Sequence, residues 1–303
     1  MIEHPEAVTI AAQIDQTLAG KKVKSAIRGN APHKWAFYSR PAEEYAAILE
    51  GEMIAGAQPS GSMILVQVES GHLLALGGGG ERILYHASPD TVPAKHQMLL
   101  HFDDGTALSV KVQGWGCCRL YTPEELDQDG WYAKRSLEPT DEGFTRAYFE
   151  GRFAALKPDD ARAIKYFLIS EPGVWGIGNG YLQDILLTAR LHPRCRAVDL
   201  SKAQRGALHQ AIVAIIKRAV RLHGRTDEHD LFDATGGYER LLNAAAAGLP
   251  CPVCGEAAIV RESFLGGAIY TCPQCQPAPP KPARRTRRND AGSAPAEGGR
   301  PGA

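Results

Sequence analysis

The sequence predicts an α+β protein in which an N-terminal helix packs on an antiparallel β-sandwich, followed by a helical bundle and a four-cysteine β-hairpin. Three observations lead to this fold class. Apolar residues recur at helical spacing near the start of the chain, and short runs separated by turn residues then extend to about residue 121. Beyond residue 122 the spacing becomes helical again, and two CxxC pairs follow it.

The bulk composition is that of a globular protein. At 303 residues the chain is long enough for two domains, taking roughly 150 residues per domain. Hydrophobic residues make up 44% and charged residues 22% of it, which is ordinary for a globular chain. No apolar run approaches the roughly 18 residues of a membrane span, and the first residues lack a signal-peptide pattern. We therefore expect a cytoplasmic protein with no membrane partner.

The first 121 residues are expected to form one helix and a series of hairpins. The helix covers residues 6–19 and ends at Gly20. SMILVQVESGHLLALG predicts two strands around a turn at 69–71, and HQMLLHFDDGTALSVKVQ predicts two more around Asp104 and Gly105. The apolar face of the helix comprises Val8, Ile10, Ala11, Ile14 and Leu18.

Three further helices are expected in the second half of the chain. The first lies in PDDARAIKYFLIS and the second follows EPGVWGIGNG. The third begins at Ser201, where Gln204 completes a capping box, and ends at Gly224. The apolar positions of the first two are Ala161, Ile164, Phe167 and Leu168, then Leu182, Ile185, Leu186 and Ala189.

The last 27 residues form a basic tail. Six basic residues outnumber two acidic ones, a net charge of +4, which leaves −4 on the rest of a neutral chain. Its Pro, Gly, Ala and Arg content cannot bury a core, so we expect it to be disordered. A basic arm suits a nucleic-acid partner, although a solvated spacer has the same composition. The chain therefore divides into a β-sandwich domain (1–122), a helical domain (123–245), a zinc-finger hairpin (246–276) and this tail (277–303).

Four of the seven cysteines form two CxxC pairs, with seventeen residues between the pairs. Four thiolates at this spacing match a closed tetrahedral zinc site, whose role is structural because no position stays open for catalysis. Chance cysteines or a redox pair are the alternatives. We expect one Zn²⁺ ion holding a β-hairpin with 266–267 at its tip. Its ligands are Cys251, Cys254, Cys272 and Cys275.

A glycine-rich turn precedes a helix in WGIGNGYLQDIL. Free backbone N–H groups in such a turn point at the mouth of the helix and form an anion site, to which Asn179 adds a side-chain amide. A simple helix connector is the alternative. The next long helix carries cations near its end, which also fit a solvated face. These cations are Lys217, Arg218, Arg221 and Arg225.

The order of these parts resembles the formamidopyrimidine-DNA glycosylase and endonuclease VIII family over about residues 1–276. The motifs that match are IEHPE at the start, Lys95-His96, GIGN at 176–179, LHP at 191–193 and the CxxCG…CxxCQ hairpin. The MIE-PEA start, the GNG turn and LGGxIYxCPxCQ are similar to an endonuclease VIII-like branch. The resemblance implies a helix–two-turn–helix module around GIGN.

The resemblance also implies an activity. In the family, the amine at the chain terminus attacks the sugar of a flipped nucleotide, and the neighbouring glutamate acts as acid and base. Ile2 and Glu3 stand at these catalytic positions. An α-amine suits the task because its pKa of about 7.7–8.0 leaves a usable unprotonated fraction. Acids at a helix start, such as Glu3 and Glu6, are otherwise explained by the helix dipole.

We therefore expect a DNA glycosylase with abasic-site lyase activity in base-excision repair. Its partner would be double-stranded DNA with oxidised or abasic nucleotides, bound by a monomer at the nucleoid if the source is bacterial. The N–H groups of residues 176–179 would hold the phosphates that flank the lesion. The side chains and positions expected to contact DNA are Lys95, Trp115, Gly178 and Asn179.

The chain departs from the family pattern at several functional positions. Ile2 replaces the terminal proline, and a retained Met1 would displace the amine by about 3.5 Å of chain, which costs heavily in a positioned reaction. The alternative function is therefore a catalytically impaired protein that binds abasic or distorted DNA. The other replacements are Ser62 for a lysine, GGGGE at 77–81 for a methionine-bearing loop, Gln113 and Trp115 for an arginine and a phenylalanine, and Gly267 for a hairpin arginine.

Overall fold

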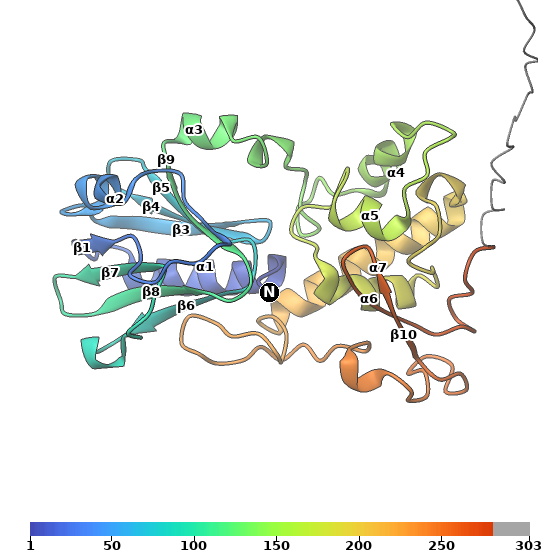
Figure 1. Ribbon diagram of the computed structural model, residues 1–303. Coiled ribbons are helices and arrows are strands. Elements are labelled where there is room, and N and C mark those ends of the chain that lie inside the picture. Colours follow the sequence, from blue (N-terminus) through green and yellow to red (C-terminus); the bar gives the residue numbers. More distant parts are fainter. Residues whose placement is uncertain (281–303) are drawn as a thin grey trace, which may run out of the picture.

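A β-sandwich built around helix α1 (His4–Leu18) forms the first part of the computed structural model, which describes residues 1–280 (Figure 1). One sheet has the order β1-β7-β8-β6 and the other β2-β9-β5-β4-β3. Apolar residues of α1 share one core with residues of both sheets, so the helix fills the sandwich. The strands are β1 (Val23–Ile27), β2 (Ala36–Phe37), β3 (Ile54–Ser60), β4 (Met63–Val68), β5 (Leu73–Gly77), β6 (Glu81–His86), β7 (Met98–Phe102), β8 (Ala107–Val112) and β9 (Gly116–Tyr121).

The two hairpins expected from the sequence are confirmed as β4–β5 and β7–β8, both antiparallel. Helix α1 begins two residues earlier than expected, because Pro5 fits the first helical turn and Glu3 caps it. One strand pair differs from the expected antiparallel pattern. The two-residue strand β2 runs parallel to β9, since it follows a long loop rather than a tight turn.

Short helices cover the sandwich and lead out of it. Helix α2 (Ala42–Leu49) packs near β1, and η1 (Pro89–Thr91) lies between β6 and β7. Helix α3 (Pro123–Gln128) and the turn η2 (Tyr132–Lys134) follow β9 and lead to the helical part (Figure 1).

The helical part packs around a second hydrophobic core. Its longest helix, α7, starts at the predicted cap Ser201 with the predicted capping box to Gln204. Helix α5 is shorter than expected, because Asp160 accepts hydrogen bonds from the backbone and guanidinium of Arg162 and holds that segment as a loop. The helices are α4 (Arg146–Ala154), α5 (Ile164–Ile169), α6 (Asn179–Thr188), η3 (Ala197–Asp199) and α7 (Lys202–Arg221).

The segment after α7 returns to the sandwich before it reaches the hairpin (Figure 1). The Tyr85 N–H on β6 donates to the Leu231 carbonyl at 2.9 Å. Arg82 on the same strand pairs with Asp233 at 3.0 Å. This return segment therefore ties the helical part to the sandwich.

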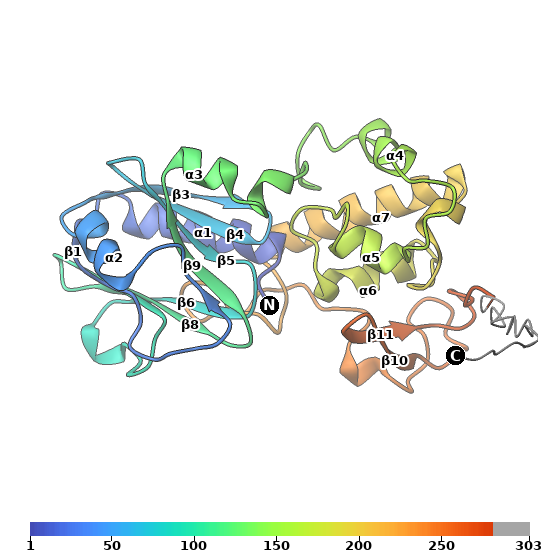
Figure 2. The ribbon, with the colours of Figure 1, turned by 45° about the horizontal axis from the view of Figure 1, so that its top comes forward.

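The chain ends its described part in the predicted hairpin, formed by β10 (Val260–Phe264) and β11 (Gly267–Thr271) after η4 (Ala244–Ala246). Figure 2 shows the hairpin beside α6, and the Tyr270 N–H donates to Gln183 on that helix at 3.2 Å. Among residues 1–280 no helix combines the length and apolar character needed to cross a bilayer. The disordered tail was predicted for residues 277–303, of which 281–303 lie outside the described part.

Candidate functional site

Glu3, one of the predicted catalytic residues, is a buried cap of helix α1. Its side chain is 1% exposed. The Glu3 N–H donates to Glu6 Oε2 at 3.0 Å, which completes a capping box at the start of the helix. The acid-rich chain start therefore has a local structural role, whatever chemistry it also performs.

The Glu3 carboxylate lies at the N-terminus of helix α6. It accepts hydrogen bonds from the backbone N–H groups of Gly178 and Gly180, both at 2.7 Å, and a longer one from Tyr181 at 3.4 Å. Of the N–H groups predicted to hold a phosphate, that of Gly178 thus donates to a carboxylate from the start of the same chain. A contact between Gly178 and DNA stays a prediction, and it would require Glu3 to release this N–H group.

Arg225 completes this buried cluster. Its Nη1 donates to Glu3 Oε1 at 2.9 Å, its backbone N–H donates to Glu6 Oε1 at 3.0 Å, and its guanidinium lies over the Tyr181 ring. The sequence placed this arginine on a row of cations that fits a solvated face, whereas its side chain is 2% exposed. We call Glu3, Glu6, Tyr181 and Arg225 the Glu3 cluster.

Burial and the neighbouring charges have opposing effects on the pKa values of Glu6 and Arg225. Burial raises the pKa of Glu6, and Arg225 opposes part of that rise. Burial alone would lower the pKa of Arg225, but Glu6 and Glu3 outweigh it and raise the pKa, so the guanidinium stays charged. Each Glu3 oxygen accepts two of the hydrogen bonds given above, which fills the capacity of a carboxylate.

The first two residues are held at the same place. The Ile2 N–H donates to the Gly79 carbonyl at 2.8 Å, and the Ile2 side chain is 2% exposed in the sandwich core. The terminal amine of Met1 pairs with Glu228, and the Met1 carbonyl accepts a hydrogen bond from Arg225. With Met1 present, the nitrogen of Ile2 is therefore an amide donor rather than an amine.

The turn before Ser62, the position at which the family has a lysine, packs tightly against neighbouring segments. The Gly61 N–H donates to Glu138 Oε1 at 2.5 Å, and the Gly61 carbonyl lies 3.2 Å from His4 Nδ1. A Cβ on Gly61 would come within 2.6 Å of the Trp175 ring carbon Cδ1. Ser62, which stands where the family has a lysine, follows this turn. An open, polar cavity of about 730 Å³ lies beside the turn and includes Ser60 and Glu138 in its walls.

Asn179 lies where α6 meets the tip of the cysteine hairpin. Its Nδ2 donates to the Ala268 carbonyl at 3.2 Å, and its Oδ1 accepts from Gln183. Lys165, which the sequence analysis missed, donates from Nζ to the Phe264 carbonyl at 2.8 Å. A Cβ on Gly267 would lie 3.4 Å from this amine. We call Lys165, Asn179 and the hairpin tip at 264–268 the hairpin contact.

A cation is thus present at the hairpin tip despite the missing arginine. Burial lowers the pKa of Lys165, and its amine has one hydrogen-bond partner among the described residues. Its signal in the sequence is weak, because a lysine between apolar residues of a short helix is typically read as an exposed interruption.

The other residues predicted to contact DNA lie on two separate loops. Trp115 is 44% exposed and packs on the GGGG loop, where a Cβ on Gly79 would lie 2.8 Å from its ring. This loop also carries the carbonyl that binds Ile2, so Trp115 belongs to the region of the chain start. Lys95 is exposed between η1 and β7, and no described contact joins it to Trp115 or Asn179. The neighbouring His96 is buried, with Nδ1 at 3.2 Å from the Pro93 carbonyl.

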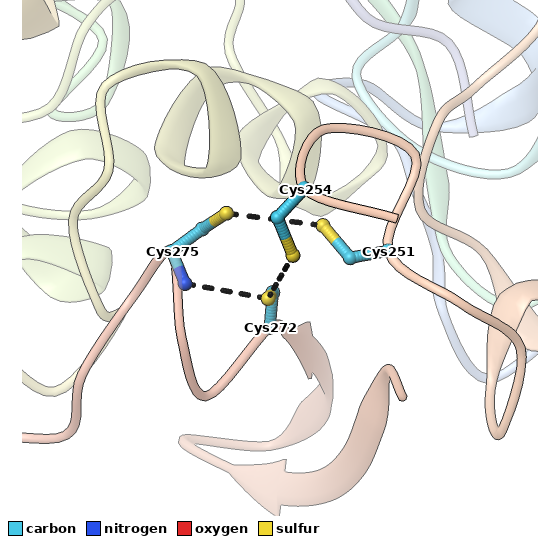
Figure 3. Close-up of side chains that lie close together, drawn as sticks. All are labelled: Cys251, Cys254, Cys272 and Cys275. Atoms are coloured by element: carbon cyan, nitrogen blue, oxygen red, sulfur yellow. Dashed lines mark hydrogen bonds between the residues drawn. The ribbon is translucent and has the colours of Figure 1, made fainter. Parts of the chain in front are cut away.

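The predicted metal ligands lie together and fit a tetrahedral ion (Figure 3). All four Sγ atoms lie within 4.8 Å of one another. Two of the Sγ–Sγ distances are 4.0 Å and 3.6 Å, close to the roughly 3.8 Å that zinc–sulfur bonds of about 2.3 Å impose. They exceed the roughly 2.05 Å of a disulfide. Backbone N–H groups of Val253 and Cys275 also point at Sγ atoms.

Comparisons with known proteins agree with this arrangement. Residues 136–230 match the formamidopyrimidine-DNA glycosylase H2TH domain. The chain is 32% identical over 239 residues to a formamidopyrimidine-DNA glycosylase of Roseiflexus sp., covering 77% of this chain and 85% of that one. It is 28% identical over 288 residues to the enzyme of that name from Exiguobacterium sp., covering 91% and 99%.

Solved structures share the fold. A variant of Lactococcus lactis Fpg in complex with a Fapy-dG-containing DNA superposes with a TM-score of 0.79 at 23% identity, covering 91% of this chain and 100% of that one. A complex of L. lactis Fpg with DNA containing an abasic site gives 0.78 at 23% identity, with the same coverage. The sandwich, the helical part and the hairpin therefore form an architecture that binds DNA in those proteins.

Proposed function

Because the chain belongs to the formamidopyrimidine-DNA glycosylase family, we propose that it is a DNA-repair glycosylase that excises oxidised bases from double-stranded DNA. We further propose an associated lyase activity at abasic sites, in which the terminal amine carries the chemistry. The endonuclease VIII-like branch remains a prediction, since the relatives named above are formamidopyrimidine-DNA glycosylases.

The observation that carries this proposal is the fixed position of the chain start. Ile2 and Glu3 are held where the GGGG loop of the sandwich meets the N-terminus of α6. Removal of Met1 would leave an amine at Ile2 beside the Glu3 carboxylate. That amine would attack C1′ of the damaged nucleotide as the bond from C1′ to the base breaks, and the nitrogen would lose a proton while the departing base takes one up. The bond between C1′ and O4′ would then break with protonation of O4′, which leaves an imine between protein and sugar. Glu3 would exchange protons with the sugar as the ring opens.

DNA would be held by the hairpin contact and by Trp115. Asn179 is half-buried and suits a backbone phosphate, and the amine of the buried Lys165 supplies a charge at the same hairpin tip. Lys95 would add a separate, peripheral phosphate contact. Since every group of this site comes from one chain, a monomer suffices, and a location at the cellular DNA would follow from the substrate.

We propose one Zn²⁺ ion at Cys251, Cys254, Cys272 and Cys275. Their sulfur geometry fits it, and the alternatives of a redox pair or chance cysteines explain four converging thiols less well. The ion would stabilise the hairpin that presents the backbone next to Asn179. It would supply no chemistry to the reaction.

A second candidate is a catalytically impaired protein that binds abasic or distorted DNA. Specific contacts favour it: the Ile2 nitrogen donates to Gly79, the Met1 amine pairs with Glu228, and the Glu3 oxygens are filled. A glutamate with no free lone pair must release a partner before it can accept a proton.

Borohydride trapping separates the two candidates. The purified chain, with its terminal residue established by mass, would be incubated with duplexes containing an abasic site or an oxidised guanine. A covalent adduct that disappears in Glu3→Gln, but not in the exposed control Glu43→Gln, supports the glycosylase. Tight binding of the abasic duplex with no adduct and no strand scission, in protein that has lost Met1, supports the second candidate instead.

A further inference from the structure

A small apolar pocket lies on the five-stranded sheet, on the face turned away from the core around α1. Its floor consists of Met63 on β4 and of Cys117, Arg119 and Tyr121 on β9. Alternate residues of β9, such as Cys118 and Leu120, point into the main core instead. Linker residues 126–132 form one wall. The cavity measures about 150 Å³, well below the roughly 300–1,000 Å³ of pockets for larger ligands.

Aromatic side chains surround this pocket and remain partly open to solvent. Phe37, Trp115 and Trp131 are 37%, 44% and 46% exposed. Trp131 packs against Trp175 with ring centroids 4.5 Å apart and an angle of 39° between the ring planes, so its indole is held in place. Single exposed apolar residues are common, but three aromatic rings around one cavity indicate a binding site.

Among the buried polar side-chain atoms of the residues that line the pocket, one atom in the described part of the chain has no hydrogen-bond partner. Arg119 Nη1 donates to Asp129 Oδ2 at 3.0 Å and to the Tyr121 hydroxyl at 3.2 Å. Asp129 also accepts from the Tyr121 hydroxyl and from two backbone N–H groups, which fills its oxygens. Arg119 Nε is buried and has no hydrogen-bond partner within residues 1–280. A ligand that fits here is flat, apolar on its faces, and carries an acceptor oxygen on its edge.

We propose that this pocket binds a single unpaired nucleobase with a ring carbonyl, of the thymine, uracil or guanine kind, from DNA bound at the chain start. The inference rests on the proposed function for its DNA partner and adds a site to it. Stacking on Trp115 and Trp131 supplies the affinity, and the Arg119 Nε donor selects the carbonyl. Trp115 packs on the loop that holds Ile2, so a strand at the chain start passes the mouth of the pocket.

The test measures binding of the full chain to three labelled duplexes: fully paired, with one bulged thymine, and with one bulged adenine. The thymine bulge should bind about tenfold more tightly than the paired duplex, within the range of base–aromatic stacking, and more tightly than the adenine bulge. Trp131→Ala and Trp115→Ala should each reduce this preference to about twofold or less. Trp131→Phe should keep most of it. Phe232→Ala is the matched control, because Phe232 is 52% exposed and lies outside the pocket.

The experiment gives one result if the pocket is wrong and a different result if the proposed function is wrong. An unchanged thymine preference in both alanine variants overturns the pocket. Equal affinity for the thymine bulge and the adenine bulge overturns the role of Arg119 Nε as the donor to a carbonyl. If the chain binds no duplex at all, the proposed function fails. Quenching of tryptophan fluorescence by single-stranded oligothymidine then decides the pocket: quenching that Trp131→Ala weakens supports it, and absent quenching overturns it.

Discussion

The Glu3 cluster and the hairpin contact both include residues of helix α6, yet their charged groups have different partners. In the Glu3 cluster, two carboxylates and a guanidinium satisfy one another and the N–H groups of α6 at full burial. At the hairpin contact, the Lys165 amine and the half-buried Asn179 amide each bind a backbone carbonyl. The charges of the first are paired with one another, whereas at the second the equally buried Lys165 amine faces a backbone carbonyl and the half-buried Asn179 is the side chain that a partner can reach. Changes in the first should therefore affect stability, and changes in the second should affect binding.

The largest expected effect is loss of the hairpin. Cys272→Ser should abolish stoichiometric zinc and unfold residues 250–276, since a hairpin of this size depends on its metal. DNA affinity should fall with it, because the Asn179 amide loses the Ala268 carbonyl. Zinc analysis and anisotropy measure both effects, with Cys195→Ser as the control. Full zinc occupancy and unchanged affinity in Cys272→Ser would contradict the site.

The next largest effect should come from a substitution that removes the cation of the Glu3 cluster. Arg225→Met leaves two buried carboxylates without their cation, and the free energy of unfolding should fall by about 3–5 kcal/mol. Chemical denaturation measures this loss. Arg221→Met, at an exposed position on α7, should change stability by less than about 0.5 kcal/mol. Equal effects of the two substitutions would remove the basis for a buried charge network.

A smaller effect should appear in binding alone. Asn179→Ala should weaken affinity for lesion DNA by about 1–3 kcal/mol, as expected for a lost charge-assisted contact. Its stability and zinc content should stay near those of the parent protein. If Asn179→Ala instead destabilises the fold and binds DNA normally, the contrast between the two regions of α6 is wrong.

The last prediction is a pH dependence of stability that arises from a third buried carboxyl outside both regions. Glu81 accepts hydrogen bonds from the N–H groups of Gly79 and Cys117, and burial raises its pKa to about 8. The folded state therefore binds a proton that the unfolded state has released above its ordinary pKa of 4.5. This stabilisation is complete below about pH 4.5 and is lost as pH rises towards about 8, with a slope of at most about 1.4 kcal/mol per pH unit.

Glu81→Gln cannot ionise and should remove this slope, although its amide can accept only one of the two backbone N–H groups. The stability of the variant relative to the parent protein should therefore increase as pH rises from about 4.5 to about 8. Denaturation at a series of pH values measures the difference. A parent protein whose stability rises between pH 5 and 8, relative to Glu81→Gln, would contradict the assignment.

Local patterns made the elements of the fold predictable. The Asp104-Gly105 turn and the Ser201 capping box follow from a few neighbouring residues, and both occur as expected. The four metal ligands were equally accessible, because their spacing alone determines the type of site. The start of α5 was wrong, since Asp160 and Arg162 form contacts that apolar spacing does not reveal.

Contacts between distant segments were the part that the sequence did not predict. The anion site before α6 was recognised, but its occupant, Glu3, lies about 175 positions earlier in the chain. Arg225 follows a row of exposed cations, and nothing in its neighbourhood indicates burial. Trp115 and Trp131 come from separate loops, so the pocket that they border could not be found from periodicity.

The close contact between Gly180 and Arg225 limits how related sequences can change. A Cβ at position 180 would lie 2.0 Å from Arg225 Nη1. A relative with any side chain at that position must therefore either lack the arginine or direct it elsewhere. The residues at the two positions should therefore vary together among related sequences.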